Sequence, residues 1–283
     1  MTPDRALDMP LSFVPMQTSH LTEAMRLSGD AGWPHRREDW EFVRGISRGF
    51  VALANERVVA TALATPFGNA AMVNLVIVDQ SLRGRGLGRE IITHAMATLD
   101  PGSWHLVATE EGLPLYEKLG FRPVGRIVQH QGIMDVTDPA GDAVWATPAD
   151  LPALIGIDRK ATMMDRTSLY RALSGQARFA VLRGPAGIAG FAAVRPFGKG
   201  RVIGPVVAGS LSEAQDLISL VMSDHAGEFL RVDTGADTGL GPWLGACGLL
   251  ETGRGLTMQK GPAPGPGKIN PPMVYALASQ ALG

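Results

Sequence analysis

The sequence predicts an α/β protein built from two successive copies of one mixed fold, in which strands and helices alternate. Three observations support this. Apolar segments on either side of the polar turn 55–57 are typical of a β-hairpin. The apolar segment 72–78 leads into a glycine-rich turn and then into a helical pattern at 89–96. Short matches recur at a roughly constant separation along the chain, which indicates an internal repeat.

The first copy reads as an ordered series of elements. A strand is expected near residue 11, and polar residues from Thr18 onward provide capping groups for a helix. The remaining elements are expected as a helix at 36–47, hairpin strands at 50–54 and 58–63, a strand at 72–78, a helix at 89–96, a strand at 104–109 and a short helix that Gly120 ends.

The repeat rests on four matches in the same order. Pro66-Phe67-Gly68 recurs as Pro196-Phe197-Gly198, and Gly125-Arg126 recurs as Gly253-Arg254. Segments 50–53 and 119–121 are echoed at 179–182 and 247–249. Scattered insertions and deletions account for the small drift in the separation. The alternative is that the second half is an unrelated α/β domain.

Composition limits the class of protein. A length of 283 residues suggests two domains, and 45% hydrophobic residues suffice for a core. The net charge of −1 does not indicate the excess of positive charge that is typical of proteins that bind nucleic acid or membrane surfaces. The single cysteine, Cys247, fits a reducing compartment and makes a structural zinc site unexpected. The start has no signal-peptide pattern, and no apolar run is long enough to span a membrane. We therefore expect a soluble cytoplasmic monomer or homodimer without a metal.

The segment Arg83-Gly84-Arg85-Gly86-Leu87-Gly88 has the pattern of an anion-binding turn. Glycines let backbone N–H groups converge on phosphate oxygens, and the helix that follows points the positive end of its dipole at them. The spacing is not that of a P-loop, and no dinucleotide-binding motif has the required context. The sequence therefore favours a cofactor with a pyrophosphate, and the alternative is an ordinary strand-to-helix turn.

The pattern Arg83-x-x-Gly86-x-Gly88 after a strand resembles the acyl-CoA loop of the GNAT (general amine N-acetyltransferase) superfamily. Further along, Tyr116, Gly120 and Phe121 match the Tyr-x-x-x-Gly-Phe pattern that follows the next strand in that family. The resemblance covers roughly residues 12–135. It implies that each copy is a mostly antiparallel sheet flanked by helices. The expected organisation is a catalytic GNAT domain at 1–137, a degenerate GNAT-like domain at 143–260, and a Pro/Gly linker with a docking C-terminal tail at 261–283.

The second copy lacks the residues that carry the resemblance. Its counterpart of the glycine-rich turn is the segment 208–214, Ala-Gly-Ser-Leu-Ser-Glu-Ala. Leu244 stands at the position that Tyr116 has in the first copy. We therefore expect the second copy to be non-catalytic.

The resemblance implies transfer of an acetyl group from acetyl-CoA to an amine. The expected oxyanion-site amides belong to Leu75, Val76, Ile77 and Val78. The expected CoA-binding residues are Arg83, Gly84, Arg85, Gly86, Leu87, Gly88 and Arg89.

Two further tasks need side chains. An alkyl amine with a pKa near ~10.4 must lose a proton before it attacks, and the departing thiolate must gain one. The candidate bases are Glu110 and Glu111, with Asp79 as an alternative. The resemblance gives the role of general acid to Tyr116.

The acceptor site is expected to include Asp30, Trp33 and Asn74, where Asn74 could orient a water molecule. Acidic and aromatic groups together suit a cationic, partly apolar amine. The predicted function is acetylation of a primary amine, on a small molecule. Two alternatives stay open: a CoA-binding sensor or scaffold without turnover, and an acetyltransferase for a protein amine.

Overall fold

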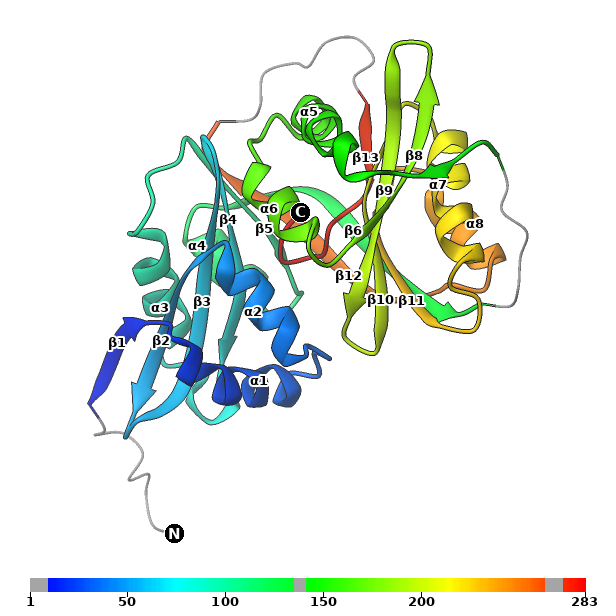
Figure 1. The fold of residues 1–283 in the computed structure, drawn as a ribbon. Coiled ribbons are helices and arrows are strands. Elements are labelled where there is room, and N and C mark those ends of the chain that lie inside the picture. Colours follow the sequence, from blue (N-terminus) through cyan, green and yellow to red (C-terminus); the bar gives the residue numbers. More distant parts are fainter. Residues whose placement is uncertain (1–9, 135–140, 263–271) are drawn as a thin grey trace. The chain divides into compact units, whose positions relative to one another are not determined.

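The computed structural model describes residues 10–134, 141–262 and 272–283 (Figure 1). Most of the segment between the domains predicted at 1–137 and 143–260, and most of the predicted Pro/Gly linker that follows residue 260, lie outside these residues. By its contacts the chain divides into two compact units. The first unit is Met1–Thr65 with Val73–Asp100, and the second unit is Pro66–Met72 with Pro101–Gly283. None of the helices in the described ranges is long and apolar enough to cross a membrane.

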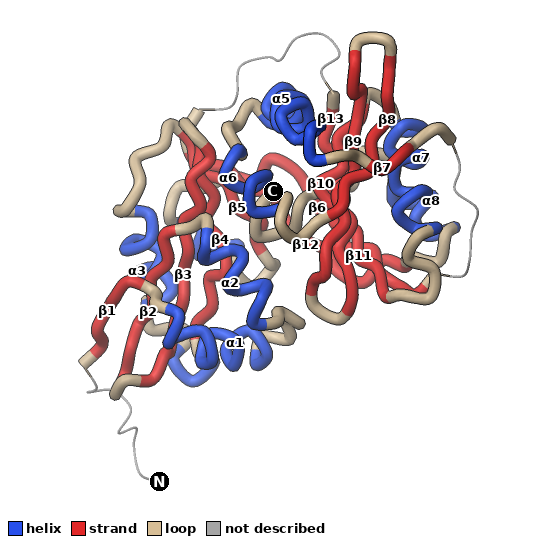
Figure 2. Tube along the Cα trace, in the orientation of Figure 1, coloured by secondary structure: helices blue, strands red, loops and turns tan. Residues whose placement is uncertain are grey.

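Most of the first unit is an antiparallel sheet with helices, as Figure 2 shows by colour. Its strands and helices are β1 (Leu11–Pro15), α1 (Leu21–Asp30), α2 (Arg37–Gly45), β2 (Arg48–Ala54), β3 (Arg57–Phe67), β4 (Ala70–Val78) and α3 (Leu87–Met96). The last residues of β3 and the first of β4 belong to the second unit. Strands β1, β2 and β3 pair in sequence order, with Phe13 opposite Ala52 and Ala52 opposite Ala60.

Helices α1 and α2 pack by one apolar face each. Helix α1 begins after a 3₁₀ turn at Thr18–His20, so the polar residues at its expected start form that turn. It buries Leu21, Ala24 and Leu27, spaced three residues apart as one helix face requires. Trp40 of α2 is fully buried, and its indole N–H donates to Ser28 Oγ at 3.1 Å. Trp40 is therefore a core residue of the first unit.

The second unit contains the rest of the first copy and all of the second. Its elements are β5 (Ser103–Ala108), α4 (Leu113–Lys118), β6 (Arg122–Ile133), β7 (Val144–Trp145), α5 (Leu151–Thr162), α6 (Thr167–Leu173), β8 (Arg178–Gly184), β9 (Gly187–Phe197), β10 (Gly200–Ala208), α7 (Leu211–Ser223), β11 (Phe229–Gly235), α8 (Leu240–Ala246), β12 (Leu250–Lys260) and β13 (Met273–Ala276).

The two copies exchange strands inside this unit. Strand β12, from the second copy, pairs with β5 of the first copy and also with β6. Strand β6, from the first copy, pairs on its other side with β11 of the second copy. Figure 1 shows β6 and β12 side by side. Because each copy completes the other's sheet, the contact-based units do not coincide with the sequence copies.

Strand β13 separates two strands of the second copy. Strands β10 and β11 pair directly only at Arg201–Leu230 and Val202–Arg231. Beyond these positions β13 enters, and Ala276 is opposite both Val206 and Thr234. Thr234 Oγ1 also donates to the Tyr275 carbonyl oxygen at 2.6 Å. The segment 273–276 is therefore an integral strand of the second unit.

Candidate active site

The glycine-rich turn of the first unit has the backbone that an anion cradle needs. Asp79 caps the 3₁₀ turn Gln80–Leu82 by accepting from the Ser81 N–H at 3.1 Å. Gly84 and Gly86 then adopt φ angles of +77° and +87°, and α3 begins at the next residue. Residues with a Cβ rarely adopt this left-handed region, so both positions favour glycine.

The amides of this turn are open. The N–H groups of Gly84, Gly86, Leu87 and Gly88 donate to no acceptor within the described ranges. A Cβ atom added at Gly84 or Gly86 would meet no atom within 4 Å. Glycine is thus required by the backbone conformation, and the space above the turn is free. Four backbone donors without an acceptor, at the start of a ten-residue helix, fit a diphosphate group.

Three arginines lie in or next to the turn in the sequence: Arg83, Arg85 and Arg89. Residues 83–86 and Arg89 are exposed. The Arg83 Nε–H donates to the Val78 carbonyl oxygen at 3.3 Å, which ties the turn to the end of β4. Exposed arginines contribute little binding energy each, so the main-chain donors carry most of the expected affinity.

Strand β4 is irregular at the first of the predicted oxyanion-site residues. Leu75 has a φ of +47°, which is uncommon for a residue with a branched side chain. The buried Thr61 hydroxyl donates to the Leu75 carbonyl oxygen at 2.7 Å and stabilises this conformation. Such a kink turns backbone groups of β4 away from the regular ladder. The predicted oxyanion-site residues, Leu75 to Val78, therefore begin at the kink.

The corresponding turn of the second copy is closed by its own side chains. Ser210 Oγ accepts from the Glu213 N–H at 3.2 Å, and the Glu213 carboxylate accepts from the Gly209 N–H at 2.8 Å. These side-chain acceptors occupy donors at the start of α7 and place a negative charge there. The second copy therefore has a carboxylate bound to the Gly209 amide at the place where the first copy has open amides.

Ser210→Ala is expected to lower the free energy of unfolding by about 1 kcal/mol, because the N-cap of α7 is lost. Ser212→Ala is the control, since Ser212 is exposed inside the same helix and alanine has the higher helix propensity. Urea denaturation followed by circular dichroism measures both variants. Equal stability of the two would show that the cap is not formed.

Tyr116 lies on α4 in the second unit and is 8% exposed. Its ring packs edge to face on Phe121, with 6.0 Å between centroids. A Cβ atom at Gly112 would lie 3.0 Å from the Tyr116 ring, so this glycine makes room for it. Gly120 ends the helix with a φ of +88°, as its sequence position predicts. Burial raises the pKa of the Tyr116 phenol well above its ordinary value, so its O–H is a proton donor at neutral pH.

The alkaline side of the rate profile tests this assignment. Because burial disfavours the phenolate, the pKa of Tyr116 is raised, and the hydroxyl stays protonated through pH 10. We expect Tyr116 to cause no decline in kcat/KM between pH 8 and pH 10 for the reaction proposed below. Any decline in this range should therefore also appear in a Tyr116→Phe variant. A falling limb near pH 10 that disappears in Tyr116→Phe would contradict the raised pKa.

The predicted bases differ in their surroundings. Glu110 and Glu111 lie exposed in the turn between β5 and α4. Asp79 is half-buried: burial alone would raise its pKa, but hydrogen bonds from Ser81 and the charge of Arg26 outweigh this and lower the pKa. A carboxylate held in this way is a poor proton acceptor. The structure thus disfavours Asp79, and Glu110 and Glu111 stay predictions.

The predicted acceptor-site residues lie in the first unit. Asp30 is exposed at the end of α1 and forms an ion pair with Arg26 at 2.8 Å. Trp33 is half-buried and meets His35 edge to face at 5.8 Å. Asn74, on β4, is 5% exposed. Asp30 and Trp33 therefore leave part of their surface open, whereas Asn74 is buried.

A chain of hydroxyl groups orients Asn74. Ser47 Oγ lies 2.6 Å from the Val43 carbonyl oxygen, which can only accept, so Ser47 donates there. Thr65 Oγ1 must then donate to Ser47 Oγ, at 2.6 Å, and it accepts from Asn74 Nδ2 at 2.8 Å. Among the residues with described positions, none bonds to the buried Asn74 Oδ1. Asn74 thus presents an unpaired acceptor, and neither Ser47 nor Thr65 was expected from sequence.

Comparisons with known proteins decide the family. One model of the acetyltransferase (GNAT) domain matches residues 45–123, and a second such model matches residues 154–269. The chain belongs to the GNAT superfamily. Both halves are therefore GNAT domains, as predicted, and the family is one of acyltransferases.

A curated relative of this GNAT protein is the uncharacterized N-acetyltransferase YitH of Bacillus subtilis, with 30% identity over 125 residues. The match spans 43% of this chain and 44% of that protein, less than half of each.

Solved structures share the fold. A putative acetyltransferase from Pyrococcus horikoshii is 18% identical in sequence and has a TM-score of 0.81. The match covers 100% of this chain and 99% of that protein. A tandem GNAT protein from the clavulanic acid biosynthesis pathway is 17% identical in sequence and has a TM-score of 0.62. The match covers 90% of this chain and 100% of that protein. These likenesses confirm the tandem GNAT architecture.

Proposed function

We propose that this GNAT protein is an acetyl-CoA-dependent N-acetyltransferase that transfers the acetyl group directly to a primary amine of a small molecule. The observation that carries the proposal is the open amide turn at Gly84–Gly88, whose counterpart at α7 is capped by Ser210 and Glu213. The first copy thus keeps the donors for one diphosphate, and the second copy does not.

The first copy's residues have separate tasks in this proposal. The open amides bind the diphosphate, and main-chain groups from Leu75 onward bind the acetyl oxygen. When bound, acetyl-CoA supplies an activated thioester. The Asn74 Oδ1 acceptor binds and orients the N–H groups of the attacking amine.

Proton movement completes the reaction. Neutralising an alkyl amine at pH 7 costs about 4.6 kcal/mol, because its pKa of ~10.4 lies ~3.4 units higher. We assign the accepting role to Glu110 or Glu111, acting through water. The Tyr116 hydroxyl gives its proton to the departing CoA thiolate. Because the amine attacks the thioester directly, no covalent enzyme intermediate forms. Cys247, the only cysteine, lies in the second copy, which argues against a thiol intermediate.

The test combines calorimetry and thiol release. Titration with CoA is expected to give one site per chain. Acetyl-CoA together with a panel of amines, amino acids and polyamines is expected to release free thiol with at least one acceptor. A stoichiometry of two would contradict the closed second turn. CoA binding without thiol release from small amines or from peptides with free N-termini would favour the sensor, and release with peptides alone would favour a protein acceptor.

The same proposal includes the cellular setting. We propose a cytoplasmic enzyme, supported by the free thiol of Cys247, and we propose that it acts as a monomer or homodimer. Fractionation of cells that express the chain, together with light scattering of the purified protein, tests both statements.

A further inference from the structure

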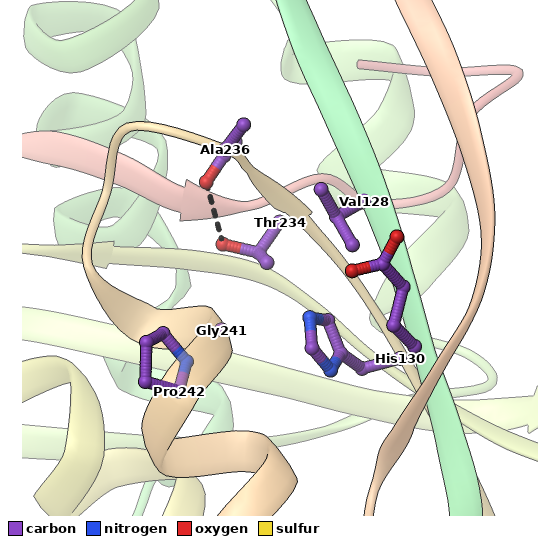
Figure 3. A pocket seen from close by; sticks show the side chains of 8 residues that line it. Val128, His130, Thr234, Ala236, Gly241 and Pro242 are labelled. Carbon is purple, nitrogen blue, oxygen red and sulfur yellow. Dashed lines mark hydrogen bonds between the residues drawn. The ribbon is translucent and has the colours of Figure 1, made fainter.

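The second unit contains a cavity of about 340 Å³ that the sequence did not predict (Figure 3). It is bounded by strands β6, β11 and β12 and by the start of α8. Its lining residues are Val128, His130, Thr234, Gly235, Ala236, Gly241, Pro242 and Glu251. None of them belongs to the predicted acetyl-transfer site.

His130 presents a hydrogen-bond acceptor to this cavity. Its Nδ1 lies 3.0 Å from the Leu249 carbonyl oxygen, which can only accept, so Nδ1 carries the proton. In the neutral ring Nε2 is then an acceptor, and no residue with a described position bonds to it. Figure 3 shows the imidazole pointing from β6 toward Gly241 and Pro242 on α8. A Cβ atom at Gly241 would lie 3.2 Å from Nε2, so the absence of a side chain there keeps the acceptor accessible.

The other polar groups of the cavity are also acceptors. Glu251 is the cross-strand neighbour of His130. Arg254 Nε donates to Glu251 Oε1 at 2.5 Å, and this ion pair holds the pKa of Glu251 below its ordinary value. Among the residues that the structure describes, none bonds to Glu251 Oε2, which remains an acceptor. Thr234 Oγ1 donates its proton to the Tyr275 carbonyl oxygen and lies 2.9 Å from Thr238 Oγ1, so toward any further group it can only accept. No lysine or arginine is among the lining residues within the described ranges. The cavity therefore suits a ligand that donates hydrogen bonds, and a cation there would share the Glu251 carboxylate with Arg254.

The first copy shows that this cavity is not a general feature of the fold. By the offset of the internal repeat, the pair His130–Glu251 corresponds to the cross-strand pair Met258–Pro123. Gly241 corresponds to Leu113 in the same way. Met258, from β12, is 1% exposed, so an apolar side chain fills this position where β12 completes the sheet of the first copy. Where β6 completes the sheet of the second copy, the three equivalent positions hold two polar groups and a glycine.

We propose that this cavity is a second binding site, which takes a small compound with a primary ammonium group. The ammonium donates to His130 Nε2 and pairs with the Glu251 carboxylate, and its carbon chain contacts Val128 and Pro242. The site stands independently of the proposed acetyl transfer, because all of its residues come from β6, β11, α8 and β12 and the turn between β11 and α8.

Two alanine variants of one helix test the site. Gly241→Ala places a methyl group against His130 Nε2, whereas at Gly245 a Cβ atom would meet nothing within 4 Å. Both glycines lie in α8 with ordinary helical backbone, so neither position needs glycine for its φ angle, and circular dichroism checks that both variants fold. The probes are ethanolamine and 1,4-diaminobutane, with ethylene glycol as the uncharged control, and the readout is the His130 ring signal in NMR spectra of the full chain.

We expect both amines to shift the His130 signal saturably and ethylene glycol to leave it unchanged. Binding should weaken at least tenfold in Gly241→Ala and in Glu251→Gln, and stay unchanged in Gly245→Ala. Calorimetry with CoA should be the same for all variants, which separates this site from the acetyl-transfer proposal. No saturable shift in the unaltered chain, or equal binding by Gly241→Ala, would overturn the inference.

Discussion

Gly86→Val is expected to weaken CoA binding about a hundredfold. Gly86 adopts a φ of +87°, where a side chain costs roughly 1–2 kcal/mol and a β-branched one more. The turn must move to relieve this strain, and the amides before α3 then lose their common direction. Each hydrogen bond to a charged group contributes about 1.5–3 kcal/mol, so the loss of two weakens binding by at least two powers of ten.

Arg85→Ala is the control for this variant. Arg85 is exposed, and removal of one exposed charge costs about 0.2–1 kcal/mol, or up to roughly fivefold in affinity. Calorimetry measures both dissociation constants, and circular dichroism checks that both variants fold. If Arg85→Ala were the more damaging change, the arginine side chains rather than the main chain would be the principal phosphate ligands.

Tyr116→Phe is expected to lower kcat about 10²- to 10³-fold, within the range typical of general acid–base catalysis. The substitution removes the hydroxyl and keeps the ring that packs against Phe121 and Gly112. The dissociation constant for CoA should therefore change by less than about twofold. Steady-state kinetics by thiol release, together with calorimetry, separates the two effects.

Tyr275→Phe is the matched control, because Tyr275 is also a buried tyrosine but lies on β13 in the second copy's sheet. Its kcat should equal that of the unaltered chain. Turnover of Tyr116→Phe that stays unchanged at every pH would remove Tyr116 from the mechanism, and the thiolate would then take its proton from solvent.

The local parts of the candidate site were accessible to sequence reasoning. A glycine-rich turn between an apolar run and a helical pattern depends on residues next to each other in the chain. The left-handed φ angles at Gly84, Gly86 and Gly120 follow from those patterns. The absence of the motif at 208–214 likewise predicted that the second turn differs, and the structure adds that Ser210 and Glu213 close it.

Other features depend on partners far apart in sequence. The kink at Leu75 is held by Thr61, and the orientation of Asn74 by Thr65 and Ser47. Each of these residues alone looks like an ordinary strand or loop residue. His130 was not expected to have a role, because only the neighbouring strands show that its imidazole faces a cavity.

The sequence by itself determined that the chain is a tandem GNAT protein with one intact glycine-rich turn, since those signals are periodicities and short motifs. Only the tertiary structure decided that β6 and β12 are exchanged between the copies, and that β13 lies between β10 and β11. The physical reason is that backbone N–H and C=O groups are alike in every strand. Which strands pair is settled by the packing of distant side chains and by chain connectivity.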